Sequence, residues 1–340
     1  MTKPTITIVG LGVIGASIGL TLRKSGGNFQ LIGHDREPSV AAKARKLNAV
    51  DKTAWNLINA IEEADLILLA IPVSAVRGTL EAMAPYLKEG CLIMDTCSVK
   101  RPVMQWADEI LPDTVSFVGG DPIVQVPAGE LGQSGPDLAS ETLFQNRMFC
   151  ICPSSRSAPQ AVRLAADLVS TLGGHPYFLD AEEHDGLVAG VEHLPLAMAA
   201  ALLSAVSHSA GWREMRKVAG DTFMRATDLA GASADALRGT SLTNADNLVR
   251  WIDETIRRLY EIRNAVRDGN EEYLDELFGE AVKHRDLWMV DRARGFAGED
   301  VLAMPETPSY WKSLFGMGGG LLRRRGGDQE SKEDDGRRRR

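Results

Sequence analysis

The chain has 340 residues, of which 44% are hydrophobic and 25% charged, a composition typical of a folded globular protein with about two domains. A net charge of -8 does not provide the basic face that nucleic-acid phosphates require, so we expect no nucleic-acid partner. The four cysteines show neither a C-x-x-C pair nor zinc-ligand spacing. We expect them to be reduced core thiols of a cytoplasmic protein without a metal site.

The first half of the chain alternates short apolar runs with amphipathic stretches. The expected strands cover residues 6–9, 30–33, 66–71, 91–95, 116–119, 148–152 and 175–178. The expected helices cover residues 14–25, 40–47, 76–87, 100–110 and 158–172. This alternation predicts an α/β fold, a Rossmann-type doubly wound parallel sheet with helices on both faces, over residues 1–180.

A glycine-rich turn joins the first expected strand to the first expected helix, with the pattern G-x-G-x-x-G over residues 10–15. Gly10 permits the tight turn, Gly12 lets a pyrophosphate approach the backbone, and Gly15 lets helix and strand pack closely. The amides at the start of the helix then face the phosphates. The sequence therefore predicts a dinucleotide site formed by Gly10, Gly12, Val13, Ile14 and Gly15.

Two further segments at strand ends extend the predicted cofactor site. Asp35 ends the second strand about 20 residues after the last glycine, where a carboxylate binds the ribose hydroxyls and repels a 2′-phosphate, which favours NAD. Arg36 offers a charge that binds such a phosphate, so NADP stays open. Ile71 and Pro72 end the third strand and are expected to line the crevice for the nicotinamide, although Pro72 also suits a plain turn.

From residue 181 onward the pattern is helical. Apolar residues recur at helical spacing from Leu248 to Val266 and again from Leu274 to Val282, with charged residues between them. We therefore expect an all-helical domain over residues 181–315. Its long apolar stripes are interpreted as an intrachain core or as the interface of a homodimer.

The segment with the longest apolar run, residues 194–206, is shorter than the roughly 20 residues that span a bilayer. We interpret it as a buried core helix and expect no membrane partner. The first residues show no signal-peptide pattern. Residues 316–340 are rich in glycine and then densely charged, which predicts a disordered tail.

The order of several short motifs resembles the prephenate/arogenate dehydrogenase family of tyrosine biosynthesis over roughly residues 5–290. The more specific pieces are Ser-Val-Lys at residues 98–100 and Gly-Gly-x-Pro at residues 119–122. Glu-His-Asp at residues 183–185 and Glu-His-Leu-Pro at residues 192–195 follow in the family's order.

The resemblance implies an oxidative decarboxylation. Hydride leaves a ring carbon that bears a hydroxyl group and reaches the nicotinamide, while carbon dioxide departs and the ring becomes aromatic. In the family, a histidine in Gly-Gly-His-Pro takes the hydroxyl proton and a serine before Val-Lys bonds near the same hydroxyl. An arginine of the helical domain binds a substrate carboxylate.

This chain keeps the serine, as Ser98, but departs from the family pattern elsewhere. Asp121 stands at the position of the histidine, and Ser-His-Leu-Pro-His reads Glu-His-Leu-Pro-Leu from Glu192 onward. Asp228 best matches the arginine, with Arg225 as the alternative alignment. The predicted catalytic residues are Ser98, Asp121 and His193, and the predicted substrate-binding residues are Glu192, Asp228 and Lys100.

Each of these residues also has a simpler interpretation. Asp121 can be a turn residue, Ser98 a helix cap and His193 a core histidine. Lys100 can be a solvated charge, and Glu192 and Asp228 can be surface acids. Three acids make the predicted site negative, so prephenate, a dicarboxylate, is expected to bind poorly. Arogenate, or an amine or imine substrate, suits such a site better, and a non-catalytic NAD-binding protein is the third hypothesis.

Overall fold

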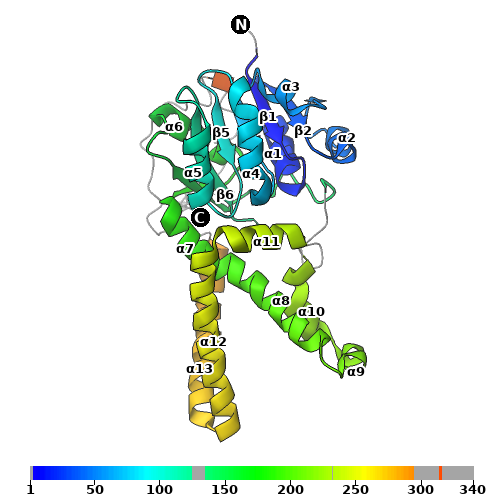
Figure 1. The fold of residues 1–340 in the computed structure, drawn as a ribbon, viewed down its shortest axis with the longest axis vertical. Coiled ribbons are helices and arrows are strands. Elements are labelled where there is room, and N and C mark those ends of the chain that lie inside the picture. The colour runs from blue at the N-terminus through cyan, green and yellow to red at the C-terminus, as the bar shows by residue number, and fades with distance from the viewer. Residues whose placement is uncertain (1–2, 125–134, 232, 295–313, 316–340) are drawn as a thin grey trace, which may run out of the picture.

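The computed structural model describes residues 3–124, 135–231, 233–294 and 314–315, and shows an α/β domain followed by an all-helical one (Figure 1). The first domain is built on an eight-stranded sheet with the order β3-β2-β1-β4-β5-β6-β7-β8. Its strands are β1 (Thr5–Val9), β2 (Gln30–His34), β3 (Lys52–Thr53), β4 (Leu66–Leu69), β5 (Leu92–Asp95), β6 (Ser116–Pro122), β7 (Met148–Pro153) and β8 (His175–Phe178).

Helices cover both faces of this sheet, which confirms the predicted fold. One hydrophobic cluster contains Leu66 and Leu68, and the other contains Ile67 and Leu69, because alternate residues of a strand point to opposite faces. The first cluster is covered by α1 (Val13–Lys24), α2 (Pro38–Lys46) and α6 (Pro159–Thr171). The second is covered by α3 (Leu57–Ile61), α4 (Val73–Met83) and α5 (Arg101–Ile110).

One strand pair departs from the predicted parallel sheet. Strands β6 and β7 run antiparallel, with Gly119 opposite Cys152 and Asp121 opposite Cys150. A parallel pair needs a crossover connection, usually a helix, and the described residues between these two strands contain none. The sequence analysis predicts both strands but expects them to run parallel, which is wrong for this pair. It misses β3 and α3, which are too short to show a periodic pattern.

The second domain is all-helical, as predicted. The hairpin of α12 and α13 projects away from the sheet, and α8, α9 and α10 form a second arm (Figure 1). The helices are α7 (Ala181–Val188), α8 (Leu194–Ser207), α9 (Trp212–Val218), α10 (Asp221–Thr227), α11 (Ala234–Thr243), α12 (Ala245–Asp268) and α13 (Glu271–Arg294). A π-helical turn, Ala189–His193, joins α7 to α8, and such turns are frequent at functional sites.

The apolar helix α8 is not the buried core helix that the sequence analysis predicts. Ala199 is its one buried residue in the single chain. Together with α7 it forms a stretch, Ala181–Ser207, that is long and apolar enough to cross a membrane, although this is weak evidence for a span. Within the same stretch, His184, Asp185 and His193 are buried polar groups bonded to the first domain. Within the described residues, the apolar surface of α8 therefore has no cover.

The sequence analysis assigns residues 181–315 to the helical domain, but the last described residues, Leu314 and Phe315, depart from this assignment. Phe315 is fully buried in the core of the first domain, not in the helical domain. Its ring meets Phe29 edge to face with centroids 5.7 Å apart, and its carbonyl oxygen accepts a hydrogen bond from the Asn28 amide. The tail predicted for residues 316–340 lies outside the described residues.

Phe315→Ala is expected to lower the free energy of unfolding by about 3 kcal/mol, as is typical for a buried phenylalanine. Urea denaturation followed by circular dichroism measures this loss. The control is Leu314→Ala, at a residue 40% exposed, which should lose less than about 1 kcal/mol. Equally small losses for both variants would contradict a stabilising role for this segment.

Candidate active site

The turn after β1 has the shape of a dinucleotide-binding turn. Gly10 has a φ of 91°, a left-handed conformation that favours glycine, and a Cβ there would lie 2.2 Å from the Ala70 carbonyl oxygen. A Cβ on Gly15 would lie 1.9 Å from the Gly10 carbonyl oxygen. Both glycines are therefore required for the close packing of this turn. Ile71, whose Cγ2 also borders Gly10, and Pro72 follow at the end of β4.

Gly12 differs from these two glycines, because a Cβ there would meet no atom within 4 Å. The open space adjoins the start of α1, whose first turn has neither a side-chain cap nor an acidic residue. Free amides beside open space suit a pyrophosphate, so the residues present fit the predicted dinucleotide. The contacts of Val13 and Ile14 with it stay a prediction.

Gly12→Ala is expected to weaken NADH binding by about tenfold, which corresponds to about 1.4 kcal/mol, because the added methyl group fills the space that a pyrophosphate needs. The fold should be unchanged, since the methyl group meets no protein atom. Gly15→Ala should instead lower the thermal midpoint of unfolding. Fluorescence titration gives the Kd for NADH, and an unchanged Kd for Gly12→Ala would contradict this placement of the cofactor.

Asp35, which follows β2, supports the same turn. One carboxylate oxygen accepts from the Leu11 amide at 2.8 Å, and the other accepts from the Glu37 amide at 2.8 Å. A carboxylate has about four acceptor positions, so capacity is left for ribose hydroxyls. The Arg36 side chain is 92% exposed and lies 3.6 Å from Glu37. The structure is therefore compatible with the predicted roles of both residues, which stay predictions.

A buried ion pair anchors the loop that carries Ser98. The Lys100 ammonium pairs with the Asp95 carboxylate, both side chains being fully buried, and also donates to the Gly120 carbonyl oxygen at 2.7 Å. Burial opposes the charged ammonium, but the charge and hydrogen bond of Asp95, together with the nearby Cys97 and Asp121, outweigh it and raise the pKa of Lys100. The predicted substrate-binding role of Lys100 and its simpler interpretation as a solvated charge are therefore both wrong, because the ammonium group is fully buried.

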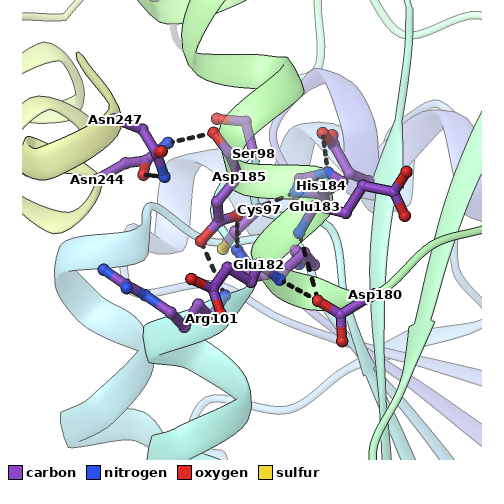
Figure 2. Close-up of polar contacts among 12 residues, drawn as sticks. Cys97, Ser98, Arg101, Asp180, Glu182, Glu183, His184, Asp185, Asn244 and Asn247 are labelled. Carbon is purple, nitrogen blue, oxygen red and sulfur yellow. Dashed lines mark hydrogen bonds and ion pairs between the residues drawn. The ribbon is translucent and has the colours of Figure 1, made fainter. Parts of the chain in front are cut away.

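Asp185, on α7, ties the helical domain to the start of α5, and Figure 2 shows it next to Arg101. Its carboxylate accepts from the backbone amides of Lys100 at 2.6 Å and of Arg101 at 2.9 Å. Helix α5 has no side-chain cap of its own, so a carboxylate from the other domain satisfies its first amides. The position of Ser98, just before this helix, therefore depends on the contact between the domains.

His184 lies buried between two carboxylates. Its Nδ1 faces Asp185 Oδ1 at 3.0 Å, and its Nε2 faces Asp121 Oδ2 at 3.1 Å. Burial opposes the imidazolium, but the hydrogen bonds to Asp121 and Asp185 outweigh it and raise the pKa of His184 to about 11. At neutral pH the ring is therefore a cation that donates to both acids.

Asp121 is a residue of β6 and not the turn residue of the simpler interpretation. Its side chain is 4% exposed. Burial raises the pKa of Asp121, and the neighbouring His184 cation partly offsets this effect. The carboxylate that stands at the position of the family's histidine is therefore enclosed by protein and already paired.

The π-helical turn brings His193 to Ser98. Nε2 of His193 lies 3.4 Å from Ser98 Oγ, and Nδ1 lies 3.3 Å from Asn244 Nδ2. Asn244 also donates to the Asp185 carbonyl oxygen at 2.8 Å and accepts from Asn247 at 2.9 Å, which fixes the orientation of its amide (Figure 2). Burial lowers the pKa of His193 to about 4, so the ring is neutral near pH 7.

Glu192 approaches the same hydroxyl group from the same turn. The Glu192 side chain is exposed, and partial burial of its carboxylate together with the nearby Asp121 charge raises the pKa of Glu192. A hydrogen bond from Ser98 partly offsets the rise. The structure therefore brings Asp121, Glu192, His193 and Ser98 together. Asp228 lies in a 3-10 turn that packs against α8 and α10.

Four site residues have no predicted role in the sequence analysis: Asp95, His184, Asp185 and Asn244. His184 and Asp185 lie within a motif that carries the family resemblance, but the motif does not show what the side chains contact. Asn244 has no such signal, because Asp185 and His193, the site residues that it contacts, are more than 50 residues away in the chain.

Both domains match one protein family. Residues 18–178 match the prephenate dehydrogenase nucleotide-binding domain, and residues 180–280 match the prephenate dehydrogenase dimerization domain. Prephenate dehydrogenase of Bacillus subtilis is 33% identical over 286 residues, covering 84% of this chain and 76% of that protein. Cyclohexadienyl dehydrogenase of Zymomonas mobilis is 32% identical over 286 residues, covering 82% and 94%.

Solved structures show the same arrangement. Prephenate dehydrogenase from Aquifex aeolicus, in complex with hydroxyphenyl propionate and NAD+, has a TM-score of 0.76 at 25% identity and covers 84% of this chain and 99% of that chain. Arogenate dehydrogenase from Synechocystis has a TM-score of 0.68 at 25% identity, with the same coverage. Both likenesses extend over the α/β domain and the helical domain.

Proposed function

The chain belongs to the prephenate dehydrogenase family, and we propose that it is an NAD-dependent dehydrogenase that oxidises and decarboxylates a cyclohexadienyl substrate. The solved Aquifex aeolicus relative supports this proposal, because it holds NAD+ and hydroxyphenyl propionate. The latter carries a phenol and a carboxylate side chain, as expected of an aromatised product. The glycine turn of this chain fits the same cofactor.

The observation that carries the proposal is the contact of Ser98 with His193 at the carboxyl end of the sheet. Ser98 follows β5, Ile71 follows β4 and Gly12 follows β1, and these three strands are neighbours in the sheet. Ligands of open α/β sheets bind at the carboxyl ends of the strands. A dinucleotide with its pyrophosphate at Gly12 therefore runs along this edge toward Ser98.

The residues around Ser98 orient its hydroxyl group, which is the chain's own contribution to the reaction. When bound, NAD accepts the hydride that leaves the hydroxyl-bearing carbon. Asn244 holds the His193 ring, and His193 holds Ser98, so the serine hydroxyl has a defined direction. In this proposal Ser98 orients the substrate hydroxyl, and His193 reaches Ser98 from the helical domain.

The charge of the site bears on the identity of the substrate. Asp121 and Glu192 are close enough that the charge of one raises the pKa of the other. Asp121 is balanced by the His184 cation, so Glu192 is the acid that, when ionised, attracts an ammonium group and repels a carboxylate, which favours arogenate over prephenate. The same acid supports a second candidate function, oxidation of an amine or imine by the same fold.

Steady-state kinetics with prephenate and arogenate, each with NAD and NADP, test this function. We expect a higher kcat/KM with arogenate than with prephenate. NAD should be preferred to NADP, because Asp35 repels a 2′-phosphate. Turnover of an amine with no turnover of either cyclohexadienyl substrate would favour the second candidate. Tight NADH binding with no turnover of any compound would favour a non-catalytic protein.

We also propose a cytoplasmic homodimer formed through the helical domain. Residues 180–280 match a dimerization domain, and α8 leaves its apolar surface uncovered. The hairpin of α12 and α13 adds the exposed apolar side chains Val249, Ile256, Leu259, Phe278, Val282 and Leu287. A second copy of the chain buries such apolar side chains without burying polar groups that lack partners. Sedimentation velocity should show a dimer, and a monomer at micromolar concentration would contradict this.

A further inference from the structure

We propose that Asn244 is a positioning residue that fixes which nitrogen of His193 carries the proton, and thereby makes Ser98 a hydrogen-bond donor to the substrate. This inference rests on the proposed function. Asn244 lies between α11 and α12 and is 1% exposed. Its backbone is held by both helices, because its amide donates to the Thr240 carbonyl oxygen and its carbonyl oxygen accepts from the Leu248 amide.

The orientation of the Asn244 side-chain amide follows from a backbone neighbour. Nδ2 of Asn244 lies 2.8 Å from the Asp185 backbone carbonyl oxygen, and such an oxygen only accepts. The atom that faces it is therefore the nitrogen of the amide and not the oxygen. Asn247 Nδ2 lies 2.9 Å from Asn244 Oδ1, which agrees with this orientation. Nδ2 gives one proton to Asp185 and directs the other at His193 Nδ1, which is 3.3 Å away.

This contact decides where His193 carries its proton. A ring nitrogen that faces an N–H donor presents a lone pair, so Nδ1 of His193 is unprotonated. An imidazolium has a proton on both nitrogens and is excluded by the same contact. Burial acts in the same direction, because it lowers the pKa of His193 to about 4. The neutral ring therefore carries its proton on Nε2, which lies 3.4 Å from Ser98 Oγ.

The other buried histidine of the site has the opposite kind of partner. His184 Nδ1 faces a carboxylate oxygen of Asp185 at 3.0 Å, and its Nε2 faces a carboxylate oxygen of Asp121 at 3.1 Å. Two acceptors hold a proton on both nitrogens of that ring, whereas the amide donor of Asn244 keeps one nitrogen of His193 bare. The two rings are thus set to different forms by the groups that face them.

The direction of these hydrogen bonds reaches the substrate through Ser98. Ser98 Oγ accepts from His193 Nε2, so its own proton is directed away from the ring. A substrate hydroxyl bound at Ser98 then accepts that proton in a hydrogen bond through its oxygen. The other tautomer of His193 would instead accept from Ser98 and leave the substrate oxygen without this donor. Asn244 therefore acts through His193 and Ser98 to hold the hydroxyl-bearing carbon in one orientation for hydride transfer.

Nitrogen NMR of protein with isotope-labelled histidine measures the tautomer without substrate or cofactor. The variant His193→Gln identifies the signals of His193. In the unaltered chain we expect a neutral ring with its proton on Nε2. In Asn244→Asp, whose ionised carboxylate only accepts, the proton should move to Nδ1. A neighbouring opposite charge raises a histidine pKa by about 1–3, so the ring of this variant is still neutral at about pH 9.

The effect on the reaction is measured as kcat and KM at the same pH, with the cyclohexadienyl substrate that the unaltered chain turns over better. Asn244→Asp should lower kcat by about 100-fold, the typical loss when a donor to the reacting oxygen is removed. KM should change by less than about threefold, because the loss concerns orientation more than binding. The control Asn264→Asp makes the same substitution at an exposed residue of α12 and should keep kcat within about twofold.

Three results would overturn the role of Asn244 and leave the proposed function intact. One is a proton on Nδ1 of His193 in the unaltered chain, which is decisive even if Asn244→Asp does not fold. The others are a folded Asn244→Asp variant that keeps its proton on Nε2 alone, or one that keeps kcat within about threefold. Turnover of neither cyclohexadienyl substrate by the unaltered chain would overturn the proposed function and the role of Asn244 together.

Discussion

Replacement of Lys100 by methionine is expected to lower the free energy of unfolding by about 3–5 kcal/mol. Methionine retains most of the length of the side chain but not its charge, so Asp95 would stay buried without a counter-ion. The Gly120 carbonyl oxygen would lose its donor as well. Urea denaturation followed by circular dichroism measures the loss.

Lys88→Met is the control for this variant, because it breaks an ion pair near the surface. Lys88 Nζ lies 2.6 Å from Asp65, and the two side chains are 42% and 27% exposed. Solvent screens such a pair, so its loss should cost less than about 1 kcal/mol. If Lys100→Met were no more destabilised than Lys88→Met, burial would not be what makes the Lys100 pair important.

Asp185→Asn is expected to lower the free energy of unfolding by about 3 kcal/mol. The carboxylate of Asp185 accepts from the amides of Lys100 and Arg101 and from Nδ1 of His184. An asparagine side chain has one acceptor oxygen in place of two, and it removes a negative charge beside the His184 cation. NMR titration should therefore also show a lower pKa for His184.

The effect of Asp185→Asn should depend on pH in a defined direction. The pKa of His184 is about 11 in the folded protein, above the ordinary value of 6.5. Its stabilising effect is therefore complete below pH 6.5 and is lost as the pH rises toward 11. The stability difference between the unaltered chain and Asp185→Asn should shrink as the pH rises from the lowered His184 pKa of the variant toward 11. A difference that grows over this range would contradict the charge assigned to His184.

Asp180→Asn is the matched control for Asp185→Asn. Asp180 caps α7 by accepting from the amides of Glu182 and Glu183, as Figure 2 shows. Asparagine caps a helix about as well as aspartate, so this variant should lose less than about 0.5 kcal/mol. The same substitution is thus compared at a surface cap and at a buried contact between domains.

The cofactor turn could be predicted from the sequence because its constraints are local. Gly15 lies against the Gly10 carbonyl oxygen within one turn of chain, Gly10 takes a positive φ, and Gly12 adjoins the same helix start. A short pattern after an apolar strand contains all of these relations. The type of the predicted elements in the first domain is likewise set by periodicity over a few residues.

The candidate substrate site could be predicted only in part. Ser98, His193 and Glu192 come from short motifs, and the structure brings them together. Lys100 is predicted from the sequence to bind substrate or to lie in solvent, yet it is fully buried and paired with Asp95 and the Gly120 carbonyl oxygen. Asp121 reads as a replacement for a catalytic base. Its pairing with His184 depends on a contact across 63 residues of chain that no local pattern contains.

The sequence by itself determined the order of strands and helices, the glycine turn and the acidic departures from the family motifs, because these features depend on neighbours within about one helical turn. The tertiary structure decided which charges are buried together, which direction β7 takes and which face of α8 stays uncovered. The reason is distance along the chain. The amide of Lys100 meets the carboxylate of Asp185 across 85 residues, and the free energy of such a contact depends on the burial that only the folded chain provides.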